Sequence, residues 1–405
     1  MEFLRDGGSS LTFGEFLKKV SEKKAIKSVL RPESFADFFV DFAAALAGGA
    51  NVVLADADMT SAELSRFGLK EFSGEQRVEI PQIKSFGELV LLARNSKSKI
   101  SLFTSGSEGR PKMAAHTVGS LSRFAKVSER HAGDVWAFAY SPSHIAGVQI
   151  FLQAFFNSNK IVNVFGKPAA ETLEALALGG VNRISATPTF YRLIPAGSIF
   201  DGVKSAGVGG EKCGADLLER LRRIFPNAKI RNVYASTEFA SLLSSEGDAF
   251  EIPESLRGLV KIENGEVLVS ISFVGEGDLP AERVEGGFYK TGDFVEFLDG
   301  SKTKFRFAGR ASSFVNVGGY KANLEEVEEA LRSICGVRDA VCYARKNSLL
   351  GNVVCAKISA EKGAELSEAE IRRSLSKRLQ NFKIPRKFEF VEKLESTKTG
   401  KAKRL

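Results

Sequence analysis

Helix-like and strand-like runs alternate along the first two thirds of this 405-residue chain. Residues 34–46 carry apolar side chains at helical spacing and lead into the short apolar run 51–54, which is typical of a strand. The same alternation continues in the segments 135–140, 148–156, 160–165, 170–178, 183–186, 216–225 and 229–233. This pattern predicts an α/β fold in which helices cover both faces of a layered sheet.

A different pattern begins at about residue 255. Short alternating segments at 266–271, 294–298 and 304–307 predict small strands, and Asp299-Gly300 is a hairpin signal between the last two. This change in pattern indicates that the sheet of the first part does not continue here.

A small α+β unit is expected after Arg310. It has two helices and two strands, at 324–334, 368–379, 340–344 and 352–358. We therefore predict two domains joined by a hinge: a large, shortened N-terminal α/β domain over residues 1–310 and a small C-terminal α+β domain over residues 311–405.

Composition narrows the class of protein. Hydrophobic residues make up 43% of the chain, enough for a sizeable core, and no apolar run is long enough to span a membrane. The first residues lack the pattern of a signal peptide, and the four cysteines have no CxxC spacing. Reduced thiols in a cytoplasmic protein are therefore expected.

The net charge of +8 does not by itself indicate nucleic-acid binding. Basic residues are interleaved with acidic ones along most of the chain, and the excess gathers between Arg372 and Arg404. A solvated helix face and tail explain this pattern, and a field of this sign also attracts phosphorylated ligands. We expect no nucleic-acid partner.

The segment 104–112 is built to hold a polyphosphate. It follows the strand-like run 100–103 and combines backbone-turning glycines, hydroxyl donors and a final cation, namely Gly106, Gly109, Thr104, Ser105, Ser107 and Lys112. It is not a Walker A loop, because Lys112 follows no glycine and precedes no serine or threonine. A nucleotide enzyme of another kind is indicated.

Four further motifs follow in a definite order. Residues 232–238 end a strand with an aromatic ring, two hydroxyls and a carboxylate, and residues 289–293 place an aspartate on a predicted tight turn. The remaining motifs are Phe-Ala-Gly-Arg at 307–310 leading into Val-Asn-Val-Gly-Gly-Tyr-Lys at 315–321, and Thr-Lys-Thr-Gly-Lys at 397–401.

Together the five motifs resemble the adenylate-forming superfamily, which includes acyl-CoA synthetases, adenylation domains of peptide synthetases and luciferases. Within it, the chain is similar to the short o-succinylbenzoate-CoA ligases. The resemblance runs from about residue 100 to the end and is weaker over residues 9–58. It implies an AMP-forming acid–thiol ligase with an adenylating domain over 1–310 and a mobile domain over 311–405.

The resemblance also implies the reaction and its partners. A small-molecule carboxylate attacks the α-phosphate of ATP in the presence of Mg²⁺, giving an acyl adenylate and pyrophosphate. A thiol then takes the acyl group, with coenzyme A as the favoured acceptor. The phosphopantetheine arm of an acyl carrier protein is the alternative, and the association of two copies into a homodimer is left open.

The resemblance assigns residues to the phosphate and the nucleoside. Lys112 and the hydroxyls of 104–107 would hold the β- and γ-phosphates, Thr237 the α-phosphate, and Glu238 the metal ion. Lys401 would bridge the carboxylate and the α-phosphate. The remaining nucleotide contacts would be adenine stacking by Tyr234, ribose binding by Asp293 with Arg310, and lining by Gly209, Gly210, Glu211, Ala235 and Ser236.

The same resemblance places the acyl group beside His144, Gly209 and Ala235. The C-terminal domain would turn about the hinge at Ser312 after adenylation. That rotation would withdraw Lys401 and present a thiol-entry face, which comprises Gly318, Gly319 and Lys321.

The chain departs from the superfamily in three ways. Ala235 replaces a glycine, Ser312 replaces a charged hinge residue, and the phosphate loop begins unusually early, at residue 104. The early loop and Ser312 favour a second hypothesis, a nucleotide-binding homologue with impaired catalysis. Against it stand the intact residues Lys112, Glu238, Asp293 and Lys401.

Overall fold

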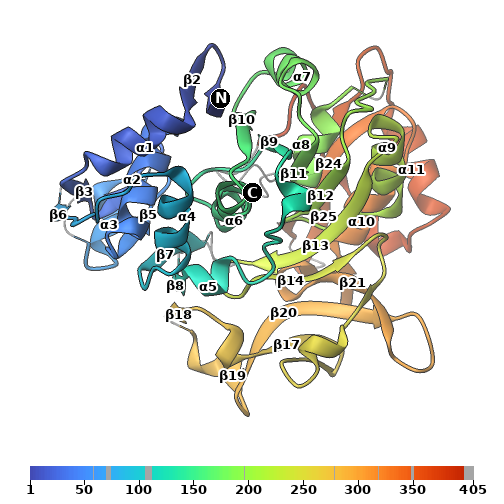
Figure 1. The fold of residues 1–405 in the computed structure, drawn as a ribbon. Coiled ribbons are helices and arrows are strands. Elements are labelled where there is room, and N and C mark those ends of the chain that lie inside the picture. The colour runs from blue at the N-terminus through green and yellow to red at the C-terminus, as the bar shows by residue number, and fades with distance from the viewer. Residues whose placement is uncertain are drawn as a thin grey trace.

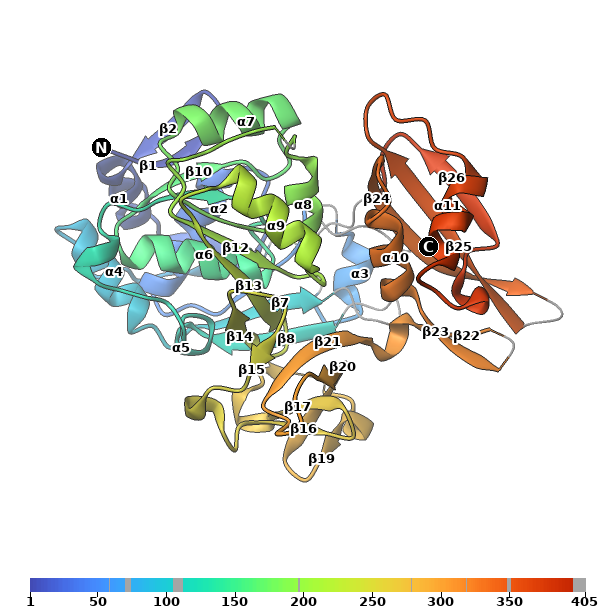
Figure 2. The ribbon, with the colours of Figure 1, turned by 90° about the vertical axis from the view of Figure 1, so that its right-hand side faces the viewer.

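The computed structural model describes residues 1–57, 59–69, 74–104, 112–195, 197–277, 279–317, 319–347 and 351–395. Figure 1 shows the large N-terminal part, from blue to light orange, and Figure 2 shows the small C-terminal part, in dark orange and red, beside it. This two-part α/β architecture confirms the predicted fold class.

An eight-stranded sheet forms the centre of the large part. Six neighbouring strands pair in parallel, and an antiparallel strand closes each edge. In spatial order the strands are β14 (Ala240–Ser245), β13 (Lys229–Ser236), β12 (Ser205–Gly209), β11 (Arg183–Ala186), β9 (Val135–Phe138), β10 (Lys160–Asn163), β1 (Glu2–Asp6) and β2 (Ser9–Thr12).

Helices cover both faces of this sheet, as the alternating pattern predicts. On one face a buried core joins the sheet to α7 (Ala169–Leu178), α8 (Pro188–Leu193) and α9 (Ala215–Ile224). On the other face a phenylalanine-rich core joins it to α2 (Phe35–Ala47) and α6 (Ile145–Phe156), where the rings of Phe39 and Phe151 stack 4.1 Å apart.

A five-stranded sheet lies beyond α2 and α6 and shares their core. Its strands are β18 (Glu276–Gly277), β8 (Lys112–Thr117), β7 (Lys99–Thr104), β5 (Val52–Leu54) and β4 (Val29–Leu30). The accompanying elements are α1 (Phe13–Ser21), α3 (Ser61–Ser65), α4 (Phe86–Arg94), α5 (Val118–Leu121) and the short pair β3 (Ala25–Lys27) and β6 (Glu75–Arg77). Helix α1 begins at a capping box, because Thr12 and Glu15 bond each other's backbone N–H.

The region after residue 245 forms an antiparallel sheet, in agreement with the predicted change of pattern. Its strands are β15 (Phe250–Glu251), β21 (Lys304–Arg310), β20 (Phe288–Phe297), β17 (Glu266–Ser270), β16 (Val260–Glu263) and β19 (Val284–Glu285). Strands β20 and β21 pair across the predicted hairpin at Asp299-Gly300. This hairpin carries two of the motifs toward the end of β13.

The C-terminal part is a small α+β unit. It contains the hairpin β22 (Phe314–Val317) and β23 (Tyr320–Asn323), the sheet β24 (Val337–Asn347), β25 (Gly351–Ala360) and β26 (Lys387–Val391), and helices α10 (Leu324–Arg332) and α11 (Glu368–Ser376). Short 3₁₀ turns lie at Glu129–His131, Glu254–Leu256, Ile271–Phe273, Ala281–Arg283, Ala311–Ser313 and Asn381–Lys383. The predicted boundary at 310 falls between β21 and one of these turns and stays a proposal.

The four cysteines are free, and three of them are buried. Across the described ranges, no helix has both the length and the apolar character that crossing a membrane requires.

Candidate nucleotide site

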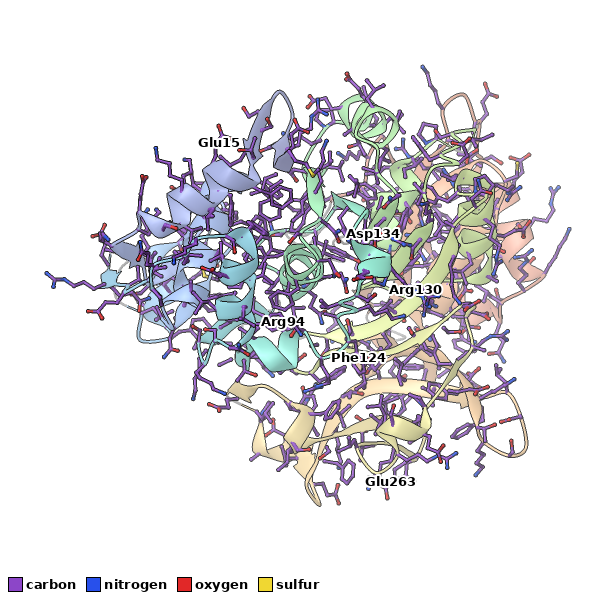
Figure 3. The ribbon with its side chains drawn as sticks, in the orientation of Figure 1. Glu15, Arg94, Phe124, Arg130, Asp134 and Glu263 are labelled. Atoms are coloured by element: carbon purple, nitrogen blue, oxygen red, sulfur yellow. The ribbon has the colours of Figure 1, made fainter. Side chains whose placement is uncertain are left out.

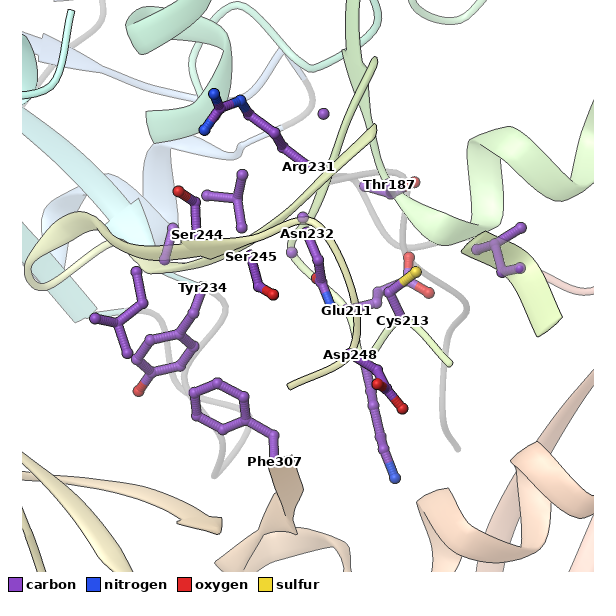
Figure 4. Close-up of a pocket in the computed structure, with 18 of the residues that line it drawn as sticks. Thr187, Glu211, Cys213, Arg231, Asn232, Tyr234, Ser244, Ser245, Asp248 and Phe307 are labelled. Carbon is purple, nitrogen blue, oxygen red and sulfur yellow. The ribbon is translucent and has the colours of Figure 1, made fainter. Parts of the chain in front are cut away.

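A cavity of about 2250 Å³ opens where the two sheets of the large part meet the C-terminal part. Figure 4 shows a portion of it around the carboxyl end of β13. Its lining includes members of every described motif, among them Lys112, Tyr234, Glu238, Asp293 and Arg310. Residues up to 198 positions apart in the sequence therefore contribute to one hollow.

The parallel strands explain why this edge of the sheet holds the site. β12 ends at Gly209 and β13 ends at Ser236, and ligands bind such sheets beyond the carboxyl ends of their strands. Gly210 has a φ of +88°, a conformation that other residues rarely adopt. A Cβ atom on Gly209 would lie 3.1 Å from the carbonyl oxygen of Val233, so β12 and β13 approach too closely there for a side chain.

The buried side chain of Asp293 is the centre of a hydrogen-bonded group. Its side chain accepts a 2.7 Å hydrogen bond from the Tyr234 hydroxyl on one oxygen and a 2.7 Å bond from Arg310 Nε on the other. The Asp293 charge raises the pKa of Arg310, and burial together with the same charge raises the pKa of Tyr234 well above its usual value. A carboxylate has further lone pairs, so Asp293 can still accept bonds from ribose hydroxyls.

The predicted tight turn before Asp293 is wrong. Residues 289–293 lie inside strand β20, where the pairing with β17 skips from Leu268↔Lys290 to Glu266↔Phe294. Three residues of β20 therefore face one residue of β17, and Gly292 takes the left-handed φ of +75° in this bulge. The bulge points the Asp293 side chain to Tyr234.

The ring of Tyr234 packs against the ring of Phe307, with 4.3 Å between the two ring centroids. Phe307 belongs to β21, in the motif that ends at Arg310. One face of Tyr234 is thus covered by protein, and adenine stacking would use what remains of the ring.

The segment Thr237–Glu238 is held by its backbone. Nε2 of His116 donates a 2.7 Å hydrogen bond to the Thr237 carbonyl oxygen, and the Gly275 amide donates a 2.7 Å bond to the Glu238 carbonyl oxygen. His116 is 3% exposed, and its Nδ1 lies 3.3 Å from the Ser120 hydroxyl. Burial lowers the pKa of His116, which favours a neutral ring with the proton on Nε2.

Sequence analysis missed His116. It lies on β8 four residues after Lys112, so one strand links the predicted phosphate lysine to the carbonyl of Thr237. A larger residue in place of Gly275 would clash with His116, because a Cβ atom there would lie 2.7 Å from the His116 ring. A histidine directly after the apolar run Met113-Ala114-Ala115 was the available signal.

Lys112 begins β8 and pairs with Thr104 across β7 and β8. Several predicted residues lie outside the described residues, namely Ser105, Gly106, Ser107, Gly109, Gly318 and Lys401, and for Thr104 only the backbone is described. In the part of the chain that the structure describes, no group of three His, Cys, Asp or Glu side chains is arranged to hold a metal ion.

Glu211 lies at the edge facing the C-terminal part. It accepts a 2.9 Å hydrogen bond from Thr189, and Arg192 Nη1 lies 3.8 Å from it and 3.6 Å from Asp339. Asp339 in turn accepts a 2.8 Å bond from Arg332. We call Arg192, Glu211, Arg332 and Asp339 the interdomain network.

Some of the remaining predicted site residues line the cavity, and others lie outside its lining. His144 caps α6 by accepting a 3.4 Å bond from the Ala146 amide, and it lines the cavity together with Ala235, Ser236 and Ser312. Gly319 and Lys321 lie on the exposed hairpin of β22 and β23 and are not part of the cavity lining.

These features define a nucleotide-binding α/β protein with a second domain at the mouth of its site. Two family profiles give the class. "AMP-binding enzyme" matches residues 94–261, and "AMP-binding enzyme C-terminal domain" matches residues 326–401. The chain belongs to this family of AMP-binding enzymes, which confirms the resemblance to the adenylate-forming superfamily.

Curated relatives include the D-alanine–D-alanyl carrier protein ligase of Staphylococcus epidermidis and the 2-succinylbenzoate–CoA ligase of Listeria monocytogenes. Each is 26% identical to this chain, over 341 and 329 residues. These matches cover 75% and 76% of this chain and 69% of each relative. Across the first curated relatives that it matches, the chain spans between 5% and 69% of their length.

The fold is shared with o-succinylbenzoate CoA synthetase from Bacillus subtilis, solved with its acyl-adenylate intermediate. The TM-score is 0.72 at 19% identity, and the alignment covers 99% of this chain and 94% of that one.

Proposed function

We propose that this protein activates a carboxylic acid with ATP and transfers the acyl group to a thiol, with coenzyme A as the favoured acceptor. One observation carries the proposal. The hydrogen-bonded group of Asp293, Tyr234 and Arg310 and the backbone-held pair Thr237–Glu238 lie on one cavity with Lys112. This arrangement offers a ribose acceptor, an aromatic ring, a metal ligand and a phosphate cation together.

In the first step the acid's carboxylate oxygen attacks the α-phosphorus and the bond to pyrophosphate breaks. Negative charge accumulates on the phosphates, so cations and donors must already be in place. Lys112 would hold the leaving pyrophosphate and Thr237 the α-phosphate. Lys401, which belongs to the C-terminal match, would bring the second cation.

Glu238 fits a magnesium site shared with substrate. Mg²⁺ usually takes one or two protein carboxylates together with phosphate oxygens, and Glu238 lines the cavity as one such carboxylate. The ion would neutralise charge on the phosphates. Glu238 would fix its place, because the Gly275 amide holds the Glu238 backbone.

In the second step the thiol sulfur attacks the acyl carbon and AMP leaves. The exposed position of Gly319 and Lys321 agrees with an arrangement before this step, since the proposed thiol-entry face is still turned away from the cavity. We propose that the C-terminal part turns about Ser312 to bring that face in.

The test is ATP–pyrophosphate exchange with a panel of acids, including 2-succinylbenzoate, D-alanine, anthranilate and straight-chain acids. Exchange with at least one acid, lost in Lys112→Ala and Glu238→Gln, is expected. ATP binding without exchange for any acid would instead support the impaired homologue.

The acceptor is tested with the acid that exchanges. The preformed adenylate is offered to coenzyme A and, separately, to a phosphopantetheinylated carrier protein. Thioester formation with coenzyme A alone supports the favoured assignment, whereas formation with the carrier alone supports the alternative, as the D-alanine relative suggests.

A further inference from the structure

The two faces of strands β11, β12 and β13 differ in character. Alternate residues of a strand point to opposite faces. The face toward α7, α8 and α9 is apolar and fully buried, with Ile184, Ala206, Val208 and Ile230 in the core. The face toward α6 carries polar residues or no side chain over most of its length, namely Ser185, Ser205, Gly207, Gly209 and Arg231.

Strand register places Arg231 in line with two small residues. Ser185 is opposite Gly207 on β12, and Gly207 is opposite Arg231 on β13. A Cβ atom on Gly207 would lie 2.7 Å from the Ser185 hydroxyl, so Ser185 leaves no room for a side chain there. All three residues line the cavity, and we call the part of the cavity beside them the groove. Gln149 and Gln153 of α6 line the same cavity.

The groove is separate from the proposed nucleotide pocket. Figure 4 shows Arg231 and Ser244 on one side of β13 and β14, and Tyr234 and Phe307 on the other. The strand therefore divides a nucleoside side from a side on which an acyl chain can lie. Phe124 and Asp134 belong to the segment between α5 and β9, which also lines the cavity (Figure 3).

Three cations of these strands belong to this face, namely Arg183, Lys229 and Arg231. In the described ranges, Arg231 is the one of the three that lacks a partner. Arg183 Nε lies 2.9 Å from Asp134, and Lys229 is paired with Glu246. In the described ranges, the Arg231 guanidinium makes no hydrogen bond or ion pair.

Glu246 also lies near Arg231, and it is the ion-pair partner of Lys229. The hydrogen bond from Lys229 and the charges of Lys229 and Arg231 lower the pKa of Glu246. Two cations thus share one exposed carboxylate, which leaves an excess positive charge beside the groove.

We propose that Arg231 binds a second anionic group of the acid that is activated. This rests on the proposed function, which places the reacting carboxyl beside Ala235 and Thr237. At 3.3 Å per residue, Arg231 lies about 13 Å along β13 from Ala235. The substrate class is therefore a carboxylic acid with a second anion on the order of 10 Å away.

This assignment excludes two other classes as best substrates. A purely apolar chain would end beside an unneutralised guanidinium and displace its water without replacing the hydrogen bonds. A diacid with both carboxyls on one carbon would be too short to reach Arg231 from the reacting position.

The test compares octanedioate with octanoate, which differ only in the second carboxylate. We expect wild-type kcat/KM for pyrophosphate exchange to be higher for octanedioate. In Arg231→Gln the octanedioate-to-octanoate ratio should fall about 10- to 100-fold, the usual effect of losing a hydrogen bond between charged groups. Arg231→Lys should restore part of the ratio, and Arg257→Gln, a surface control, should leave it unchanged.

Equilibrium binding of both acids in the presence of AMP gives a readout without turnover. Tighter binding of octanedioate that depends on Arg231 supports the subsite even if no acid supports exchange, an outcome that would sink the proposed function alone. Equal binding of the two acids to wild-type protein, or an equal loss for both in Arg231→Gln, overturns the inference. Thermal unfolding of each variant checks that it is folded.

Discussion

The site has two regions that are held in different ways. The inner region, around Asp293 and Thr237, is fixed by short hydrogen bonds of 2.7 Å within the large part. The outer region, the interdomain network, joins the two parts through Arg192, whose Nη1 lies 3.6 Å from Asp339 and makes no hydrogen bond. Short bonds within one part suit a fixed pocket, and the long contacts of Arg192 suit an interface that opens. The two parts are also joined by a partly exposed ion pair of 2.9 Å between Lys212 and Glu329.

The contrast indicates which contacts of the site must stay fixed during the reaction and which must be able to break. A nucleotide pocket gains from preorganised donors that need no rearrangement during reaction. A domain that must turn between two half-reactions gains from contacts that are weak enough to break. The two regions are therefore expected to behave as a fixed part and a movable part.

Lys401→Ala gives the sharpest separation of the two half-reactions. We expect adenylate formation to fall by at least about 100-fold, because a preorganised cation at the developing charge is lost. Thioester formation from preformed adenylate should remain nearly intact. Single-turnover assays of each half-reaction measure this, and an equal fall in both would contradict the movable-domain comparison.

Asp293→Asn tests the fixed region. The amide donates where the carboxylate accepts, so the bonds from Tyr234 and Arg310 cannot both survive. We expect the Kd for ATP to rise about 10- to 100-fold, the range for bonds to charged groups. Asp299→Asn is the matched control, because it lies on the same hairpin with its side chain bonded to Ser301 and Thr303. Unchanged ATP affinity in Asp293→Asn would remove Asp293 from the ribose site.

The motifs and the α/β alternation were predictable because they are local. Each motif is contiguous, and the family profiles match the regions that carry three of the five, at 104–112, 232–238 and 397–401. The bulge before Asp293 was not predictable, because it depends on pairing with β17, which sequence analysis cannot place in register. The same limit explains His116, whose partner Thr237 is 121 residues away, and Arg192, whose partner Asp339 lies in the other part.

His116→Phe asks whether the fixed region includes a residue outside the motifs. The Thr237 carbonyl would be left without its donor, so we expect kcat to fall about 10-fold and the free energy of unfolding to drop by about 1–3 kcal/mol. His116→Gln keeps a donor and should restore part of kcat. A KM effect with unchanged kcat would contradict a positioning role.

The pH dependence gives His116 a second test. Burial lowers its folded pKa below the ordinary 6.5, so the unfolded chain binds the proton more readily. The stability that depends on neutral His116 is present above about pH 6.5 and is lost as the pH falls below it. The stability difference between wild type and His116→Phe should therefore shrink from pH 7.5 to pH 5, as followed by chemical denaturation.

Arg192→Gln should have the smallest effect on activity. The informative result is which of the two half-reactions changes. Arg192 is 9% exposed and its pKa is lowered by burial, so the cation gains little from its long contacts and costs desolvation. We expect only a few-fold change in adenylate formation, with thioester formation rising relative to it as the interface loosens.

A double-mutant cycle of Arg192→Gln with Asp339→Asn measures the contact itself, on thermal unfolding and on the ratio of the two half-reactions. A coupling of about 1 kcal/mol is expected for neighbouring charges. Because Arg332 bonds Asp339 within the C-terminal part, Arg332→Gln should lower the stability of that part without shifting the ratio. If Arg192→Gln instead cost as much ATP affinity as Asp293→Asn, the interdomain network would belong to the fixed pocket and the distinction between the two regions would fail.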